Sequence, residues 1–394
     1  MLHFPSNALS SVLEDLLDHV HADEAQQLRM PIKLELGGGL GAATLAVQVV
    51  ATWARLSSQT RQIRLSKWFA ESAETKKRFA STLPGMAALY FADSIDCEGT
   101  IIRRQDALVP VAPHVDAMDN EDYQNTLRGI GVALCCFMGA RKEYLKPLYA
   151  DARPRGVHDE TTFSQLVQRV LESLNNGRSL AINDGQSTYI TSMVHQLFLN
   201  SDQHGAYDQL GERYKSGIRG ITARFITLND MPSLVSYAGN DSPLRSYLTR
   251  LPLLPFQGQK PRSRSEKPAA QPIRLLEISV FDTGPGLALR WMAERYGAKS
   301  YDDFSETEEL AAVKTCFEKH TTTKAGKLYG QGLPEALGAL RKLSAFMTLR
   351  TGRLSLYQDF SNAKTSDFSP TMRFQCRQLA EIAGAAYTIW FRVK

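Results

Sequence analysis

The sequence predicts an α/β protein that is built from two domains. Residues 32–65 follow the order strand, glycine-rich turn, helix and strand, which is the pattern of a β-turn-α-β unit. Two long strands, rich in β-branched and aromatic residues, are expected at residues 218–228 and 273–281. The chain has 394 residues, enough for two or three domains at about 100–200 residues each.

Composition and charge narrow the class of protein. Hydrophobic residues make up 43% of the chain and charged residues 22%, which is typical of a globular protein. The net charge of +5 is smaller than we expect of a dedicated nucleic-acid binder. No stretch approaches the ~18 apolar residues of a membrane helix, and the N-terminus does not have the pattern of a signal peptide. Five scattered cysteines do not form a disulfide framework, so we expect a cytoplasmic protein without membrane contact.

The first domain is expected to cover residues 1–155. Its pattern predicts a strand at Ile32–Leu36, a glycine turn, a buried helix at Ala42–Leu56 and a second strand at Gln62–Leu65. No acidic residue ends the second strand, so close packing explains the glycines better than dinucleotide binding does. The strand–turn–helix element resembles that of STAS-like domains, which are small α/β modules often used for protein contacts.

The second domain, residues 156–394, contains three motifs that carry chemistry. The first is a helix expected at Ser187–Gln203, in which Gln196, Asn200 and His204 recur every four residues and form a polar stripe. An asparagine carboxamide can offer its oxygen to a Mg²⁺ ion that also binds phosphates. The alternative is an ordinary solvated face of the helix.

The second motif is the segment that follows the strand at 273–281. Asp282 ends this strand, and Gly284 and Gly286 precede a helix expected at Leu287–Tyr296. A carboxylate fixed at a strand end can accept a hydrogen bond from the exocyclic amine of adenine, and glycines let the backbone approach a flat base. The alternative is a simple strand-to-helix turn with a capping aspartate.

The third motif is a glycine turn that leads into a helix whose first residue is Pro334. The free N–H groups and the positive dipole end of such a helix suit phosphate oxygens. Threonines and a lysine upstream are typical of a lid that closes over phosphates. The residues expected around the phosphates are Thr322, Thr323, Lys324, Gly330, Gln331, Gly332 and Leu333.

The order of these motifs resembles the N, G1 and G2 boxes of the GHKL ATPase superfamily. This superfamily includes type II topoisomerases, ninety-kilodalton heat-shock chaperones, MutL-type repair proteins and histidine kinases. The resemblance covers about residues 161–394 and implies a Bergerat fold, an α/β sandwich with a mixed sheet and helices on one face. The ATP-binding residues that it implies are Asn200 (also the Mg²⁺ ligand), His204, Asp282, Gly284, Gly286, Thr322, Thr323, Lys324, Gly330, Gln331, Gly332, Leu333 and, in the last strand, Thr388.

The chain departs from the superfamily at Gln196, which occupies the position of the usual catalytic glutamate. A carboxamide does not take a proton from water at neutral pH, so the usual general base is missing. Three interpretations stay open. Hydrolysis of ATP is very slow, or His195 or His204 orients the water, or the chain transfers phosphate to another protein.

A second departure is an insertion at about residues 230–272, between two strands that should form a hairpin. The main hypothesis is a Mg·ATP-dependent conformational switch that acts on a protein partner or in a homodimer. One alternative is a protein kinase that acts in trans. The other is a nucleotide-stabilised scaffold that contacts nucleic acid through the basic part of the insertion, Lys260, Arg262, Arg264 and Lys267.

Overall fold

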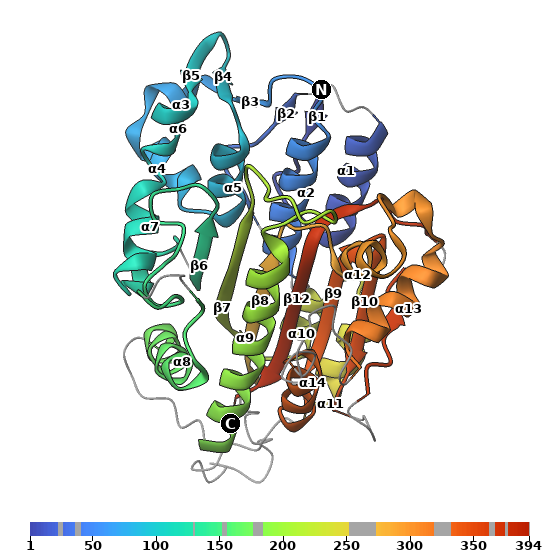
Figure 1. Cartoon of the computed structure of the whole chain (residues 1–394). Coiled ribbons are helices and arrows are strands. Elements are labelled where there is room, and N and C mark those ends of the chain that lie inside the picture. Colours follow the sequence, from blue (N-terminus) through green and yellow to red (C-terminus); the bar gives the residue numbers. More distant parts are fainter. Residues whose placement is uncertain are drawn as a thin grey trace, which may run out of the picture.

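The structure is a computed structural model of the chain with two β-sheets and helices packed on both (Figure 1). In Figure 1 the first sheet lies above the second, and helices α9 and α14 cross in front of the second sheet. Within the described residues, no helix is long and apolar enough to cross a membrane. The structure describes residues 1–22, 27–35, 41–128, 131–151, 156–175, 184–251, 273–318, 332–361, 367–374 and 377–393.

Helices and strands are mixed along the chain, with several helices or strands in succession. The helices are α1 (Ser10–Ala22), α2 (Ala42–Leu56), α3 (Lys67–Glu71), α4 (Ala73–Ala80), α5 (Leu83–Phe91), α6 (Arg104–Leu108), α7 (Ala112–Asp119), α8 (Glu160–Leu174), α9 (Asp184–Gly205), α10 (Met231–Ala238), α11 (Ser242–Arg250), α12 (Leu287–Tyr296), α13 (Glu306–Cys316) and α14 (Gly332–Lys342), with short 3-10 helices at Tyr123–Asn125 and Tyr301–Asp303. The strands are β1 (Leu2–His3), β2 (Leu28–Arg29), β3 (Gln62–Leu65), β4 (Ser94–Cys97), β5 (Thr100–Arg103), β6 (Val132–Phe137), β7 (Ile218–Leu228), β8 (Ile273–Asp282), β9 (Phe346–Gly352), β10 (Leu354–Asp359), β11 (Thr371–Met372) and β12 (Ile382–Arg392).

The first sheet has the order β1-β2-β3-β4-β5 and is mixed, because β1 to β4 are parallel and β5 is antiparallel to β4. The predicted helix Ala42–Leu56 and strand Gln62–Leu65 are confirmed to the residue. The strand predicted at Ile32–Leu36 is wrong over residues 32–35, and Leu36 lies outside the described residues: the chain pairs with β3 earlier, at Leu28–Arg29. Pro31 explains the shift, because proline has no N–H group to continue the ladder of hydrogen bonds.

The second sheet has the order β11-β10-β9-β12-β8-β7-β6. The mixed sheet expected in this part of the chain is wrong, because all neighbouring strands of this sheet are antiparallel. Strands β7 and β8 pair over their whole lengths despite the long segment between them. Strand β6 lies before residue 156 but pairs with β7, so the sheet draws on both sides of the expected domain boundary.

Helices cover both faces of the second sheet, so the expectation of helices on one face is also wrong. Helices α9 and α14 pack together on the face that carries Val280 and Tyr387. Helix α2 covers part of the opposite face, where Trp390 also packs against α10 and α11. The reason lies in β12, of which all residues but the last are buried. A strand that is apolar on both faces needs cover on both.

A buried ion pair joins the N-terminal helices to the second sheet. The Glu14 carboxylate of α1 accepts hydrogen bonds from Arg350 of β9, at 2.9 Å from Nε and 3.0 Å from Nη2. The Gln48 side chain of α2 donates to the carbonyl oxygens of Arg350 and Ala383. One hydrophobic core extends through both sheets. The N-terminal residues therefore form part of the same folded body as the second sheet.

We expect Glu14→Ala to destabilise the whole chain by about 3 kcal/mol or more, because it leaves the buried Arg350 guanidinium without its carboxylate. The double variant Glu14→Leu, Arg350→Met should lose less than the two single variants together, since it removes both charges. Urea denaturation measures both effects. A cost below about 1 kcal/mol for Glu14→Ala would show that the pair does not fix the helices to the sheet.

Candidate functional site

The site is built around Asp282, the last residue of β8. Its side chain is 5% exposed, and Oδ1 accepts a hydrogen bond from the Gly284 N–H at 2.8 Å. Burial raises the pKa of the Asp282 carboxyl to about 6, although the Gly284 N–H and the charge of Arg55 act in the opposite direction. The structure thus holds a buried carboxylate at the strand end where the sequence predicts an adenine contact.

Two side chains from other parts of the chain hold the turn that follows Asp282. Arg55, in the last turn of α2, donates to the carbonyl oxygens of Thr283 and of Gly284, the latter at 2.7 Å. The Tyr301 hydroxyl donates to the carbonyl oxygen of Pro285 at 2.9 Å. Three successive carbonyl groups of the turn therefore have fixed donors, which makes the turn a rigid element.

Sequence reasoning missed Arg55 as part of this site. The residue belongs to the first domain, more than two hundred positions before the turn that it contacts. Its guanidinium also lies over the Tyr214 ring, 3.9 Å from the ring centroid. A lone arginine at a helix end gives no sequence signal for such a contact, because the contact depends on how α2 packs against the second sheet.

The last turn of α9 packs directly on the Asp282 turn. A Cβ added at Gly205 would lie 2.5 Å from Cβ of Asp282, and one added at Gly284 would lie 2.7 Å from Cα of Gly205. A Cβ added at Gly286 would lie 2.5 Å from the Tyr301 hydroxyl. These three glycines are needed for contacts within the protein. The contact of Gly205 with Asp282 and Gly284 joins the first and the second sequence motifs at this point.

The same helix also contacts the start of α14, which belongs to the third motif. A Cβ added at Gly332 would lie 2.7 Å from Oε1 of Gln196. Nε2 of Gln196 donates to Oε2 of Glu335, in the first turn of α14, at 2.9 Å. The described parts of all three motifs therefore meet along a single helix, α9.

Asn200 lies on α9 between these two contacts. It is one helical turn, about 6 Å, beyond Gln196 in the direction of Gly205. At about 100° per residue, Asn200 is turned by about 40° from Gln196 towards the sheet-facing side of the helix, which carries Leu197 and Ser201. This direction points into the angle between α14 and the sheet. The residue is half-buried there, and its amide oxygen would suit a hard cation such as Mg²⁺.

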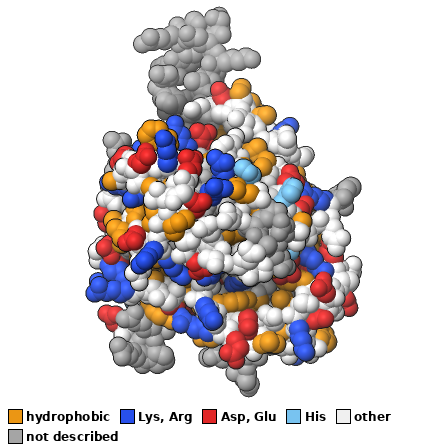
Figure 2. Space-filling model, turned by 90° about the horizontal axis from the view of Figure 1, so that it is seen from above, with side chains coloured by type: hydrophobic (Ala, Val, Ile, Leu, Met, Phe, Trp, Pro, Cys, Tyr) orange, Lys and Arg blue, Asp and Glu red, His pale blue; other side chains and the backbone are white. Residues whose placement is uncertain are grey.

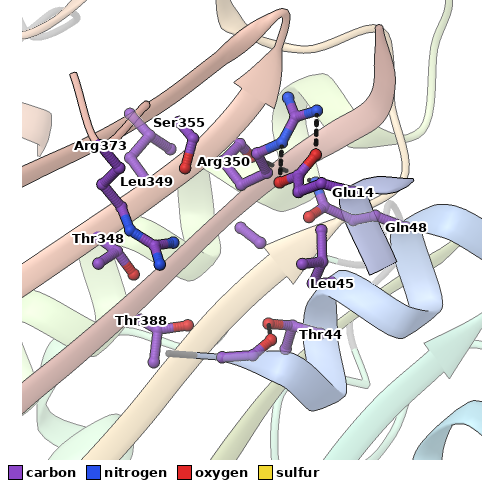
Figure 3. A pocket seen from close by; sticks show the side chains of 12 residues that line it. Glu14, Thr44, Leu45, Gln48, Thr348, Leu349, Arg350, Ser355, Arg373 and Thr388 are labelled. Carbon is purple, nitrogen blue, oxygen red and sulfur yellow. Dashed lines mark hydrogen bonds and ion pairs between the residues drawn. The ribbon is translucent and has the colours of Figure 1, made fainter. Parts of the chain in front are cut away.

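Thr388 is not brought to the other predicted site residues. It pairs with Ser279, which is three residues from Asp282, so its side chain lies on the opposite face of the sheet. There its hydroxyl lies 2.9 Å from the Ser279 hydroxyl. Figure 3 shows Thr388 in a small polar pocket between the sheet and α2, near Thr44 and Arg373. Thr388 therefore lies apart from Asp282, and the backbone of Ala385 is the part of β12 that hydrogen-bonds to the Asp282 carboxylate.

The other residues predicted for the site lie in different surroundings. The Leu333 side chain is buried in the core, so only its backbone is left for a ligand. His204 is half-buried in the last turn of α9. Nε2 of His195, a candidate for orienting water, lies 2.9 Å from the carbonyl oxygen of His158. Thr322, Thr323, Lys324, Gly330 and Gln331 lie outside the described residues.

A comparison with family models, with curated proteins and with solved structures finds no match to this chain. Among the residues that the structure describes, no group of three or more His, Cys, Asp or Glu side chains could hold a metal ion. The functional interpretation therefore depends on the contacts of α9, the Asp282 turn and α14.

We expect Asp282 to make the stability of the chain depend on pH. Its pKa is about 6 in the folded chain and near 3.8 when unfolded, so between these values the folded state binds more protons. The free energy of unfolding should therefore fall by up to ~3 kcal/mol as the pH rises from about 4 to about 6, and then level off. Denaturation of the wild type and of Asp282→Asn across this range measures the effect. Parallel pH profiles for the two proteins would contradict it.

We also expect Arg55→Met to loosen the turn at residues 283–286, because two buried carbonyl groups lose their donor. Amide hydrogen exchange of this turn should become faster. Gln48→Met is the matched control: Gln48 lies on the same helix and also donates to two carbonyl groups of the second sheet, but not to this turn. Equal exchange of the turn in the two variants would show that Arg55 has no specific role there.

Proposed function

We propose that the chain binds Mg·ATP where α9, the Asp282 turn and the start of α14 meet, and that it acts as a nucleotide-dependent conformational switch. The observation that supports this best is the double contact of α9. Gly205 packs on Asp282 and Gly284, while Gln196 packs on Gly332. The described parts of three motifs that are far apart in the sequence thereby lie together, which supports a nucleotide site with Asp282 as the base anchor at one end and the N-terminus of α14 at the other.

Each element has a part in this proposal. The Asp282 carboxylate would accept a hydrogen bond from the adenine amine, which favours binding above about pH 6, where the carboxyl is ionised. The amide oxygen of Asn200 would be a ligand of Mg²⁺, and the N-terminus of α14 would face the phosphates. Magnesium would supply charge neutralisation of the phosphate oxygens.

The contacts of the turn support a switch. A nucleotide base that presses on the Asp282 turn would also act on Arg55, and so on α2, which packs against α1 and α5. The turn would then be the element that transmits binding to the N-terminal residues. Gln196 at the position of the usual base favours slow or unconventional hydrolysis, so that the bound state persists.

The nucleic-acid alternative has less support. An extended surface of positive charge is the usual footprint of such binding. On the face shown in Figure 2, Lys and Arg side chains are interspersed with Asp and Glu. The basic residues from Lys260 to Lys267 lie outside the described residues.

Isothermal titration with a non-hydrolysable ATP analogue tests the proposal. We expect the wild type to bind in the presence of Mg²⁺ and Asp282→Asn to bind at least about tenfold more weakly, because the amide no longer offers a carboxylate to the base. Asn200→Ala should weaken binding with Mg²⁺ present and have little effect after chelation of the metal.

Asp230→Asn, at an exposed helix cap, serves as the control and should bind like the wild type. No heat from the wild type, or undiminished affinity in Asp282→Asn, would overturn the proposed function.

A further inference from the structure

The contact between Gln196 and Glu335 places a carboxylate beside the position of the missing base. Gln196 itself cannot take a proton from water at neutral pH. Its Nε2 donates to Oε2 of Glu335 at 2.9 Å, so the Glu335 carboxylate lies within one hydrogen bond of the Gln196 amide. A carboxylate is thus present at this end of α9, but it comes from α14.

We propose that Glu335 is the general base for hydrolysis of the nucleotide and that Gln196 is the residue that positions it. This inference rests on the proposed function. The Gln196 amide contacts only one carboxylate oxygen in the described structure, and the Glu335 side chain is exposed. A carboxylate held through one oxygen keeps lone pairs with which to accept a proton from water.

The packing of α14 fixes the place of Glu335. Leu333, Ala336 and Leu337 are buried in the core, which sets the rotation of the helix about its axis. Gly332 packs so closely on Gln196 that the first turn of α14 has little freedom to slide along α9. Glu335 therefore projects from α14 towards α9 close to Gln196, one turn from the predicted Mg²⁺ ligand Asn200.

His195, one of the two histidines considered for orienting the water, is less well placed. His195 follows Val194 and precedes Gln196, so on α9 it is turned by about 100° from Gln196, away from the direction of Asn200. Its Nε2 lies 2.9 Å from the His158 carbonyl oxygen, and its ring packs edge-on against Phe163 of α8. His195 thus serves the contact between α9 and α8.

The bonds and the proton of the proposed hydrolysis step can be followed atom by atom. Glu335 accepts a proton from a water molecule as the water oxygen forms a bond to the γ-phosphorus. The bond between this phosphorus and the bridging oxygen to the β-phosphate breaks, and its electron pair stays with ADP. The proton then passes from Glu335 to solvent, so that ATP and water give ADP, inorganic phosphate and one proton.

A set of three variants tests this assignment. Glu335→Gln should retain the affinity of the wild type for the non-hydrolysable analogue but reduce phosphate release by about a hundredfold, the usual effect of removing a general base. Gln196→Glu places two carboxylates in contact and should lower the melting temperature of the nucleotide-free protein. The exchange variant Gln196→Glu, Glu335→Gln reverses the hydrogen bond, and should restore both the melting temperature and phosphate release.

Glu306→Gln is the matched control, because Glu306 lies in the first turn of α13, a helix of the same length, away from α9. It should hydrolyse ATP like the wild type. Wild-type binding with undiminished phosphate release in Glu335→Gln would overturn the role of Glu335 and leave the proposed function standing. Nucleotide binding without any phosphate release by the wild type would also overturn the role of Glu335 and leave the proposed function standing. Absence of nucleotide binding by the wild type would overturn both proposals.

Discussion

The close contact between the end of α9 and the end of β8 is the constraint on which the site depends. It exists only because Gly205 and Gly284 have no side chains, so that backbone meets backbone beside the Asp282 carboxylate. Once this end of α9 is fixed, its direction across the sheet decides what the rest of the helix contacts. Gln196 then meets Gly332 at the start of α14, and Asn200 lies between the two contacts.

Burial of Asp282 has a cost that the surrounding structure offsets in part. A carboxylate out of water is unfavourable, and its pKa rises to about 6 although the Gly284 N–H and Arg55 favour the charged form. Arg55 comes from α2, and the same helix reaches the second sheet through Gln48. The N-terminal residues therefore do more than cover a sheet face: they supply one of the groups that shape the turn.

Much of the fold could be predicted from local patterns. The predicted bounds of α2, β3, β7 and α12 agree with the structure to the residue, because periodicity and terminal glycines or turns define them locally. The strand near residue 32 was misplaced because Leu28, Met30, Ile32 and Leu34 continue one alternating pattern through Pro31, and only pairing decides where the strand ends. Strand direction and the cover on the second face also depend on contacts between distant residues.

The same holds for the site: features within one segment could be predicted, and contacts between distant residues could not. Asp282 and the glycines around it lie in one short segment and form a recognisable motif. The position of Thr388 depends instead on strand register, because a shift of one residue moves its side chain to the other face of the sheet. The pairing of Gln196 with Glu335 depends on how two helices pack, and neither segment alone indicates it.

This last contact changes how the missing glutamate of α9 is understood. A base that belongs to α9 alone is in place whenever the helix is folded. A base that α14 delivers is in place only while the start of α14 packs on α9, at Gly332 and Gln196. Under the proposed function, hydrolysis would depend on the packing of two helices, and loss of the contact between Gly332 and Gln196 would remove the base without unfolding α9.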